Sequence, residues 1–201
     1  MSSIVSFLKK LPVDVGQAEK KHDSAGKRIA FSLVPDGTGK TALDIGCRDG
    51  YWSERLKKRG YAMSALDIEP LYADAVRHDV EQGLPYLDDS FDLVWCTEVV
   101  EHLRDPEILF EEIERVMRPG GIAVLTTPNS HWWFYGLVRL WGWTPQRLQN
   151  PDHKQFFDER RIRNLAKGYS LFGYFPYAVF FLRIRRLVGL LSPTFILVRR
   201  F

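Results

Sequence analysis

The sequence predicts an α/β fold with a doubly wound, mostly parallel sheet, helices on both faces and an antiparallel strand at the carboxyl end. Three observations predict it. Short apolar segments alternate with amphipathic ones over residues 41–128, a glycine-containing turn joins the first of each kind, and a β-branched run lies at 194–198. Such alternation is typical of βαβ units, whose parallel sheets bind ligands at the carboxyl ends of their strands.

The composition is that of a globular protein. Hydrophobic residues make up 45% of the 201 residues and charged residues 26%, which excludes a disordered or fibrous chain. At this length we expect a single domain over residues 1–201. Two cysteines, Cys47 and Cys96, are too few for a disulfide framework, and the sequence begins without a signal-peptide pattern. We therefore expect a reducing, cytoplasmic setting.

Charge is divided unevenly along the chain. Residues 154–201 carry 10 Lys and Arg but only 2 Asp and Glu, although the net charge of the whole chain is +3. The longest apolar run in this basic part, 174–182, is well short of the ~20 residues that span a bilayer. We therefore expect no transmembrane helix.

The first predicted elements are a helix, a strand and a second helix. Apolar residues recur with helical spacing at 29–34 before a Pro-Asp-Gly turn signal at 35–37, so we expect a leading helix that covers one edge of the sheet. The apolar segment 41–45 predicts a strand. An amphipathic segment at 51–59 then predicts a helix that ends at Gly60.

Three further strands are expected before residue 100: 61–66, a short one at 75–78, and a buried one at 91–96. The segment 68–74 between the first two of these is too short for a full crossover helix. That connection must therefore be abbreviated.

The next predicted elements are helical and then extended. A helical stretch at 98–103 leads to an amphipathic helix at 106–117, which has proline at its start and a Pro-Gly-Gly turn after its end. Strands are expected at 122–127 and at 194–198. Between them the composition changes to aromatic and arginine-rich, and there we expect the variable, ligand-facing elements.

The clearest candidate ligand-binding residues lie where the first predicted strand is followed by its helix. The segment Leu43–Gly50 places glycines directly after a strand, where they let a ligand approach the backbone closely. Asp67 ends the next strand 23 residues after Asp44, close to the offset at which a carboxylate accepts hydrogen bonds from a ribose diol. Together these features predict a site for a nucleoside-containing cofactor.

In this order and spacing the motifs resemble those of class I S-adenosylmethionine-dependent methyltransferases, which have a Rossmann-like fold. The matching segments are Leu43–Gly50, Asp67, His78–Val80, Leu84–Pro85, Ser90–Asp92, Glu98–Leu103, Arg118–Gly121 and Thr126–Asn129. The resemblance implies methyl transfer with S-adenosyl-L-methionine as cofactor. Residues 41–128 are then the cofactor-binding core, 1–40 an N-terminal helical cover, and 129–201 a substrate-facing insertion with the last strands.

The resemblance also implies roles for individual residues. Asp44 would orient the turn and the cofactor's amino group, Asp67 would hold the ribose hydroxyls, and Asp79 with the Val80 amide would read the adenine. The implied cofactor-binding residues are Asp44, Gly46, Cys47, Arg48, Gly50, Asp67, Ile68, Asp79, Val80 and Cys96. Taken without the surrounding motifs, Asp44 is interpreted as a turn-capping acid and Asp79 as a solvated one.

Arg48 departs from the family pattern, which usually has a glycine at this position. Its bulk could crowd the cofactor, or its charge could meet the cofactor's carboxylate. This departure leaves an alternative to the enzyme, namely a catalytically silent relative that uses the fold as a binding or scaffolding module.

Glu98, Glu101 and His102 have the helical spacing i, i+3 and i+4, which would place them on one face at the carboxyl end of the fourth strand. A hydroxyl acceptor needs a group that removes its proton, and we select His102 as this base, with Glu98 as a second catalytic residue. The structural alternative is that Glu98 favours the first helical turn and His102 is packed or solvated.

A divalent metal is an alternative rather than the expectation. Glu98, Glu101, His102 and His153 resemble the metal ligands of small-RNA terminal 2′-O-methyltransferases and of some quinone-biosynthesis O-methyltransferases. A cation there would lower the pKa of the acceptor hydroxyl. However, the same helix, and a histidine before paired phenylalanines, are widespread in family members without a metal.

The acceptor is expected to be a small or lipid-linked compound with a hydroxyl group. The aromatic segment Trp132–Trp143 and the stretch 169–186 could form an apolar acceptor pocket, contact an anionic membrane, or simply cap the sheet. RNA is another partner for basic and aromatic surfaces, but the net charge is small and no RNA-binding module is recognisable. We therefore place RNA behind small acceptors, and expect a cytoplasmic protein with peripheral membrane contact as a further possibility.

Overall fold

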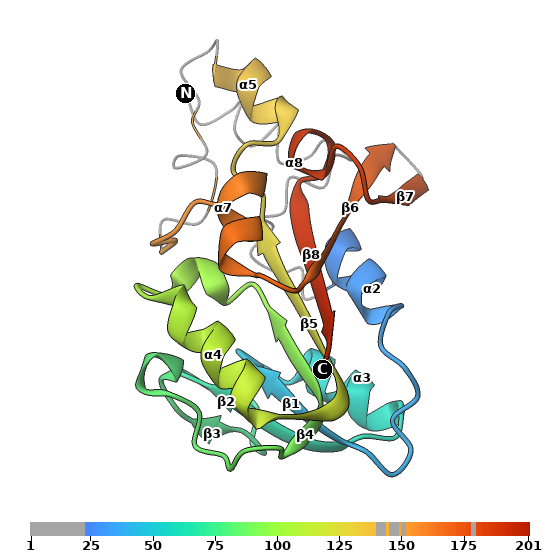
Figure 1. Cartoon of the computed structure of the whole chain (residues 1–201), viewed down its shortest axis with the longest axis vertical. Coiled ribbons are helices and arrows are strands. Elements are labelled where there is room, and N and C mark those ends of the chain that lie inside the picture. Colours follow the sequence, from blue (N-terminus) through green and yellow to red (C-terminus); the bar gives the residue numbers. More distant parts are fainter. Residues whose placement is uncertain (1–22, 140–143, 145–148, 150–151, 178–179) are drawn as a thin grey trace.

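The structure, a computed structural model, describes residues 23–139, 144, 149, 152–177 and 180–201. An eight-stranded sheet crosses the molecule in the order β3-β2-β1-β4-β5-β8-β6-β7 (Figure 1). Its strands are β1 (Thr41–Ile45), β2 (Ala62–Asp67), β3 (Val76–Arg77), β4 (Phe91–Thr97), β5 (Met117–Pro128), β6 (Ser170–Tyr177), β7 (Phe180–Ile184) and β8 (Thr194–Arg200).

The strands divide into a parallel and an antiparallel part. The strands from β3 to β5 pair in parallel, and β8, β6 and β7 continue the sheet in antiparallel fashion. The predicted mostly parallel sheet with an antiparallel strand at the carboxyl end is therefore confirmed. All five strands predicted between residues 41 and 127, and the last strand, are present, although β5 begins earlier than predicted, at Met117, and continues through the Pro-Gly-Gly segment.

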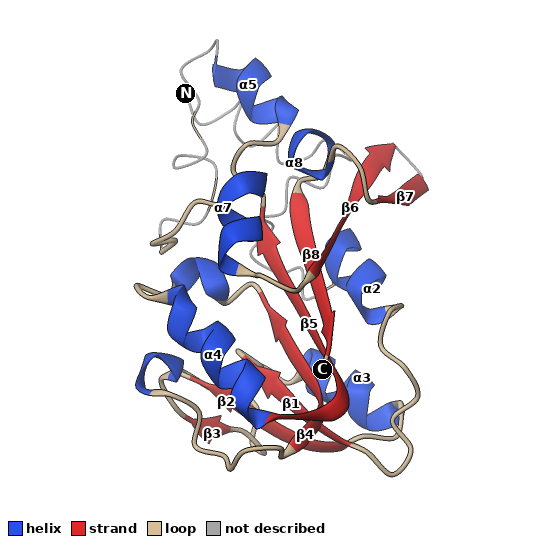
Figure 2. Ribbon diagram, in the orientation of Figure 1, coloured by secondary structure: helices blue, strands red, loops and turns tan. Residues whose placement is uncertain are grey.

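Helices cover both faces of the sheet, as predicted (Figure 2). They are α2 (Ala25–Phe31), α3 (Tyr51–Lys58), α4 (Pro106–Val116), α5 (Trp133–Arg139), α7 (Glu159–Leu165) and α8 (Val188–Leu191), with 3-10 turns at Val80–Gln82 and Val100–His102. One apolar core packs α2 and α3 against the sheet. A second core packs α4, α7 and α8 against the opposite face. Among the described residues, no helix combines the length and apolar character needed to cross a bilayer.

The leading helix differs from its prediction. It begins at Ala25, where the Ser24 side chain caps it by accepting a hydrogen bond from the Lys27 amide, and it ends at Phe31. It packs on a face of the sheet rather than on an edge, because Ala25 and Ala30 are buried in the core that also contains Trp95. Because these side chains are small, the helix can pack closely against the sheet.

Much of the stretch 169–186 is part of the sheet, which agrees with the alternative that it caps the sheet. Its first part is β6, whose side chains Leu171, Phe172 and Tyr174 are buried. Three β6 residues pair with β8, and β7 then pairs with β6. This stretch therefore extends the sheet. Of the tryptophans in the preceding aromatic segment, Trp132 is buried, and Trp141 and Trp143 lie outside the described residues.

Candidate cofactor and catalytic site

The carboxyl ends of three neighbouring strands bring the predicted site residues to one edge of the sheet. Ile45 at the end of β1 is in register with Leu66 of β2 on one side and with Cys96 of β4 on the other. The glycine turn, the ribose acid Asp67 and the segment after β4 therefore start side by side. This is the edge at which parallel α/β sheets bind their ligands.

The turn after β1 requires its glycines. Gly46 and Gly50 have φ of 75° and 77°, a region that other residues rarely adopt. A Cβ atom on Gly46 would lie 2.3 Å from Cγ2 of Val99, and one on Gly50 would lie 2.3 Å from Cδ2 of Tyr72. The turn is thus shaped both by its own backbone and by the segments that follow β4 and β2.

Arg48 also has a positive φ, 46°, at the position where the family usually has glycine. Its amide donates a hydrogen bond to Asp67, 2.8 Å from Oδ2, and its carbonyl accepts from the Leu71 and Tyr72 amides. Asp67 Oδ1 accepts from the Glu69 amide at 2.8 Å. Because each carboxylate oxygen has a further lone pair, Asp67 can still accept hydrogen bonds from a ligand.

The residues beside Asp67 offer an apolar surface and a polar turn. Ile68 is 61% exposed, so its aliphatic side chain is accessible at this edge of the sheet. Asp79 caps the turn Val80–Gln82, since its Oδ1 accepts from the Glu81 amide at 3.0 Å, and Val80 packs in the core. Asp79 therefore caps a turn, whereas the interpretation of it without the surrounding motifs was a solvated acid, and this role leaves its second carboxylate oxygen for another partner.

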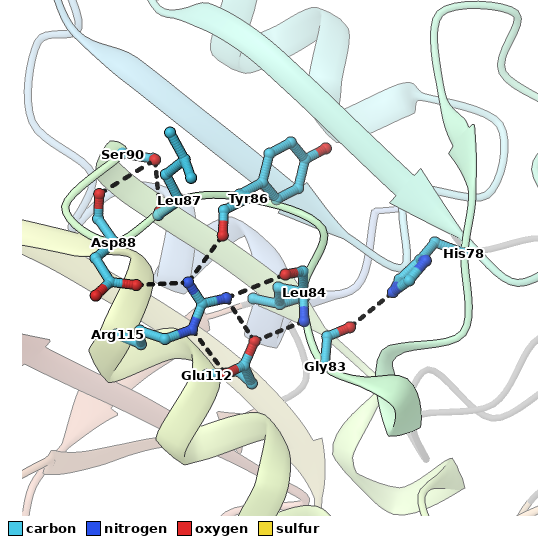
Figure 3. Close-up of polar contacts among 9 residues, drawn as sticks. All are labelled: His78, Gly83, Leu84, Tyr86, Leu87, Asp88, Ser90, Glu112 and Arg115. Atoms are coloured by element: carbon cyan, nitrogen blue, oxygen red, sulfur yellow. Dashed lines mark hydrogen bonds and ion pairs between the residues drawn. The ribbon is translucent and has the colours of Figure 1, made fainter.

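The loop between this turn and β4 is pinned to α4 (Figure 3). Arg115 donates to the carbonyls of Leu84 and Tyr86 at 3.0 and 2.8 Å, and Glu112 accepts from the Leu84 amide at 2.6 Å. The guanidinium of Arg115 holds the pKa of Glu112 below its usual value. The adenine-side loop is therefore fixed by side chains, although it contains little regular structure.

Asp44 lies in β1, just before the turn, and is 2% exposed. The Ser53 hydroxyl donates a hydrogen bond to its Oδ2 at 2.6 Å. Burial raises the pKa of Asp44 to about 7. Burial likewise raises the pKa of the Cys47 thiol to about 12 and that of Cys96 above its usual value, so neither is a thiolate nucleophile at neutral pH.

The raised pKa of Asp44 predicts a specific dependence of stability on pH. Between about pH 4 and pH 7 the unfolded chain ionises Asp44 while the folded chain keeps it protonated, so its contribution to stability is lost as pH rises through this window. In the absence of ligand, the free energy of unfolding of wild type should fall by on the order of 4 kcal/mol over that pH range, relative to that of an Asp44→Asn variant. Parallel denaturant titrations at pH 4.5 and 7.5 check this, and an unchanged difference between the two proteins would contradict it.

The predicted catalytic helix at 98–103 is wrong in its first half. Glu98 has φ of 59° and precedes a 3-10 turn of three residues, Val100–His102, so the three candidates do not share a helical face. Glu98 instead bonds to β5, where its Oε1 accepts from the Thr126 hydroxyl at 2.9 Å. Glu101 is 1% exposed and accepts from the Thr127 hydroxyl through Oε2 at 2.9 Å.

His102 is oriented by a backbone carbonyl. Its Nδ1 lies 3.3 Å from the carbonyl oxygen of Asp152, which can only accept, so in the neutral ring Nδ1 carries the proton and Nε2 has the lone pair. The ring of His153 packs edge-on against that of His102, with centroids 4.8 Å apart. Burial and the neighbouring His102 lower the pKa of His153 to about 4, so His153 is neutral at physiological pH.

Glu101, His102 and His153 could together hold a divalent cation. One potential ligand atom from each lies within 4.8 Å of the others, and this group does not include Glu98. Within the described part of the chain, Glu101 Oε1 and His153 Nδ1 are buried without a hydrogen-bond partner. A carboxylate with neutral imidazoles suits Mn²⁺, Zn²⁺ or Fe²⁺, so the residues fit a metal.

A separate groove of about 550 Å³ lies between α4 and α7. Its walls include Phe110, Phe157 and Tyr169, and no residue of the candidate site lines it. The chemistry described above is therefore not located in this groove.

The fold and the site together define a class I S-adenosylmethionine-dependent methyltransferase. The family model described as "Methyltransferase domain" matches residues 17–171, so the chain belongs to this family of methyltransferases. It is similar to a solved SAM-dependent methyltransferase from Archaeoglobus fulgidus, with 18% identity and a TM-score of 0.63 over 91% of this chain and 97% of the other.

Relatives of known name are similar over part of their length. In an alignment of 153 residues the chain is 31% identical to the ubiquinone biosynthesis O-methyltransferase of Aeromonas salmonicida (strain A449), and the match covers 66% of this chain and 63% of the relative. In an alignment of 152 residues it is 28% identical to the enzyme of that name from Idiomarina loihiensis, and that match covers 66% of this chain and 62% of the relative. The match thus covers less than two thirds of the length of either relative.

Proposed function

We propose that this methyltransferase transfers the methyl group of S-adenosylmethionine to a hydroxyl group of a small or lipid-linked acceptor. The observation that carries the proposal is the orientation of His102, whose Nε2 is free to accept a proton at the ligand-binding edge of the sheet. The names of the relatives, which are O-methyltransferases, support an oxygen acceptor.

In this proposal the turn after β1 receives the methionine portion of the cofactor. Gly46 and Gly50 leave room for it, Asp44 accepts hydrogen bonds from its ammonium group, and Asp67 accepts from the ribose hydroxyls. The exposed side chain of Ile68 packs on the adenine, and Asp79 with the Val80 amide reads the edge of that ring. These contacts place the sulfonium methyl group near the segment that follows β4, because Val99 of that segment packs against Gly46.

His102 then acts as the general base. As the acceptor oxygen attacks the methyl carbon in line with the departing sulfur, Nε2 takes the hydroxyl proton. The carbon–sulfur bond breaks, its electron pair stays on sulfur, and S-adenosylhomocysteine and the methyl ether are formed. The imidazolium returns its proton to water after the products leave.

Metal-assisted transfer is the second candidate, and the two unpartnered buried atoms of Glu101 and His153 favour it. Glu101, His102 and His153 would hold the cation. When bound, it would lower the pKa of an acceptor hydroxyl and so reduce the need for a base. The same metal-assisted chemistry would suit a terminal 2′-hydroxyl of RNA.

The atom that receives the methyl group tests the proposal. The enzyme is incubated with methyl-¹³C-labelled S-adenosylmethionine and phenolic or catechol acceptors, with and without an isoprenoid tail, and with a short RNA in a parallel arm. We expect a labelled methoxy carbon in the product NMR spectrum, and labelled N-methyl or C-methyl groups would contradict it. Turnover that survives EDTA excludes the metal-assisted candidate, and turnover restored by Mn²⁺ supports it.

The lipid-linked form of the acceptor is supported by a surface on β7 and α8. Leu182, Leu187 and Leu190 are 67%, 64% and 51% exposed. Arg183, Arg185 and Arg186 are exposed between them. Exposed leucines interleaved with arginines suit the interface of an anionic membrane.

We therefore expect the protein to sediment with phosphatidylglycerol vesicles and not with phosphatidylcholine vesicles. A Leu187→Asp variant should lose most of this binding, because the leucine is exposed within the basic surface. Leu87, which is 82% exposed on the loop before β4, provides the matched control through Leu87→Asp. Equal loss in both variants, or none in either, would contradict a specific membrane surface.

A further inference from the structure

Glu81 contacts two segments that are distant from it in sequence. It lies in the 3-10 turn directly after Asp79, and its side chain is 24% exposed. Its Oε1 accepts a hydrogen bond from the Arg104 amide at 2.5 Å and lies 3.6 Å from Nζ of Lys154. Arg104 follows His102 by two residues, and Lys154 is the neighbour of His153. One carboxylate therefore holds both segments that carry the site's histidines.

Those two segments are also bonded to each other. The amides of Lys154 and Gln155 both donate to the Glu101 carbonyl at 2.9 Å. The Gln155 side-chain amide donates to the carbonyls of Leu103 and Arg104 at 3.2 and 3.0 Å. The two segments therefore form one hydrogen-bonded unit, and Glu81 contacts both of them.

Glu81 connects the two histidine segments to a different part of the chain than the other contacts do. The remaining bonds join the two histidine segments to each other, whereas Glu81 joins them to the turn at Asp79 and Val80. Its hydrogen bond to a backbone amide is charge-assisted and directional, whereas its ion pair with the half-exposed Lys154 contributes little to stability. The arrangement is suited to fixing geometry rather than to stabilising the fold.

We propose that Glu81 is a positioning residue that couples the adenine end of the cofactor site to His102 and His153. The inference rests on the proposed contact of Asp79 and Val80 with the adenine. When the cofactor binds at that turn and shifts it, Glu81 carries the change to Arg104 and Lys154 and sets the orientation of the two imidazoles. Cofactor binding thereby prepares the acceptor site.

Histidine side-chain NMR tests this coupling without an acceptor. The full chain is labelled at its five histidines, and the signals of His102 and His153 are assigned with the variants His102→Gln and His153→Gln. S-Adenosylhomocysteine is expected to shift both signals in wild type. In Glu81→Ala these shifts should fall by about half or more, while the Kd for S-adenosylhomocysteine stays within about fivefold of wild type.

Two further variants separate positioning from a general effect on the fold. Glu81→Gln retains an acceptor for the Arg104 amide and is expected to keep most of the shift, whereas Glu111→Ala removes an exposed glutamate of α4 and should leave the shift unchanged. Full shifts in Glu81→Ala, or an equal loss in Glu111→Ala, would overturn the proposal. The NMR experiment contains no acceptor, so its result does not depend on which compound is methylated. If the acceptor proves not to be a hydroxyl compound, the proposed function is wrong but the coupling through Glu81 can still hold.

Discussion

An Asp67→Ala variant is expected to bind S-adenosylhomocysteine about 100-fold more weakly than wild type. The proposed carboxylate bonds to the ribose hydroxyls are charge-assisted, and losing two of them costs about 3 kcal/mol, which corresponds to that factor. The substitution also frees the Arg48 and Glu69 amides, which the carboxylate holds at 2.8 Å, so the turn itself is released. Isothermal titration calorimetry of both proteins measures the effect.

Two control variants separate the ribose contact from the turn. Asp67→Asn keeps one side-chain oxygen that can accept, so its affinity is expected to lie between those of wild type and Asp67→Ala. Glu69→Ala removes an exposed carboxylate beside the site but keeps the Glu69 amide, which is the group that bonds to Asp67. This variant should therefore bind S-adenosylhomocysteine as wild type does. Wild-type affinity in Asp67→Ala, with the fold intact by circular dichroism, would show that the ribose is held elsewhere.

The parallel part of the sheet could be predicted because its signals are local. β1, β4 and the buried part of β5 are short apolar runs, and α4 has an apolar stripe after a proline that suits its first turn. The turn between β1 and α3 was equally visible, since positive φ angles at Gly46 and Gly50 require glycine. In these cases a few consecutive residues determine the local structure.

In the antiparallel part, β8 was predicted from its own apolar run, but the hairpin of β6 and β7 was missed for the opposite reason. β6 joins the sheet by pairing with β8, from Ser170 with Val198 to Phe172 with Ile196, and these partners are distant in the chain. Arg183 and Arg185 interrupt the apolar pattern, and in the structure both guanidinium groups stack on the ring of Phe172. Arginines that cover a sheet in this way look, in sequence, like a solvated or ligand-binding surface.

The site shows the same division between local and distant contacts. The sequence drew attention to the side chain of Arg48, and the structure adds that its amide and carbonyl make the bonds that join the turn to the segment after β2. Glu98 was expected on a helix, but its φ is positive and the turn begins two residues later, at Val100. Glu81 had no signal at all, because its partners Arg104 and Lys154 are distant in sequence.

A His102→Gln variant is expected to lower kcat by roughly 10²–10⁴, the range of a lost general base. Glutamine keeps the size of the side chain but cannot take up a proton at neutral pH. The Kd for S-adenosylhomocysteine should remain close to that of wild type, because none of the proposed cofactor contacts involves this residue. Steady-state kinetics on the acceptor found by product analysis, together with calorimetry, measure both quantities.

The neighbouring histidine provides the matched control. His153 is neutral at physiological pH and packs against His102, so it shares the location but has no role in the base mechanism. If His102 acts alone as the base, His153→Gln should reduce kcat far less than His102→Gln does. If instead the two variants and Glu101→Gln lose activity equally, and EDTA has the same effect on wild type, the three residues act as one metal site. The ratio of the kcat values of the two histidine variants therefore decides whether these residues act as a general base or as a metal site.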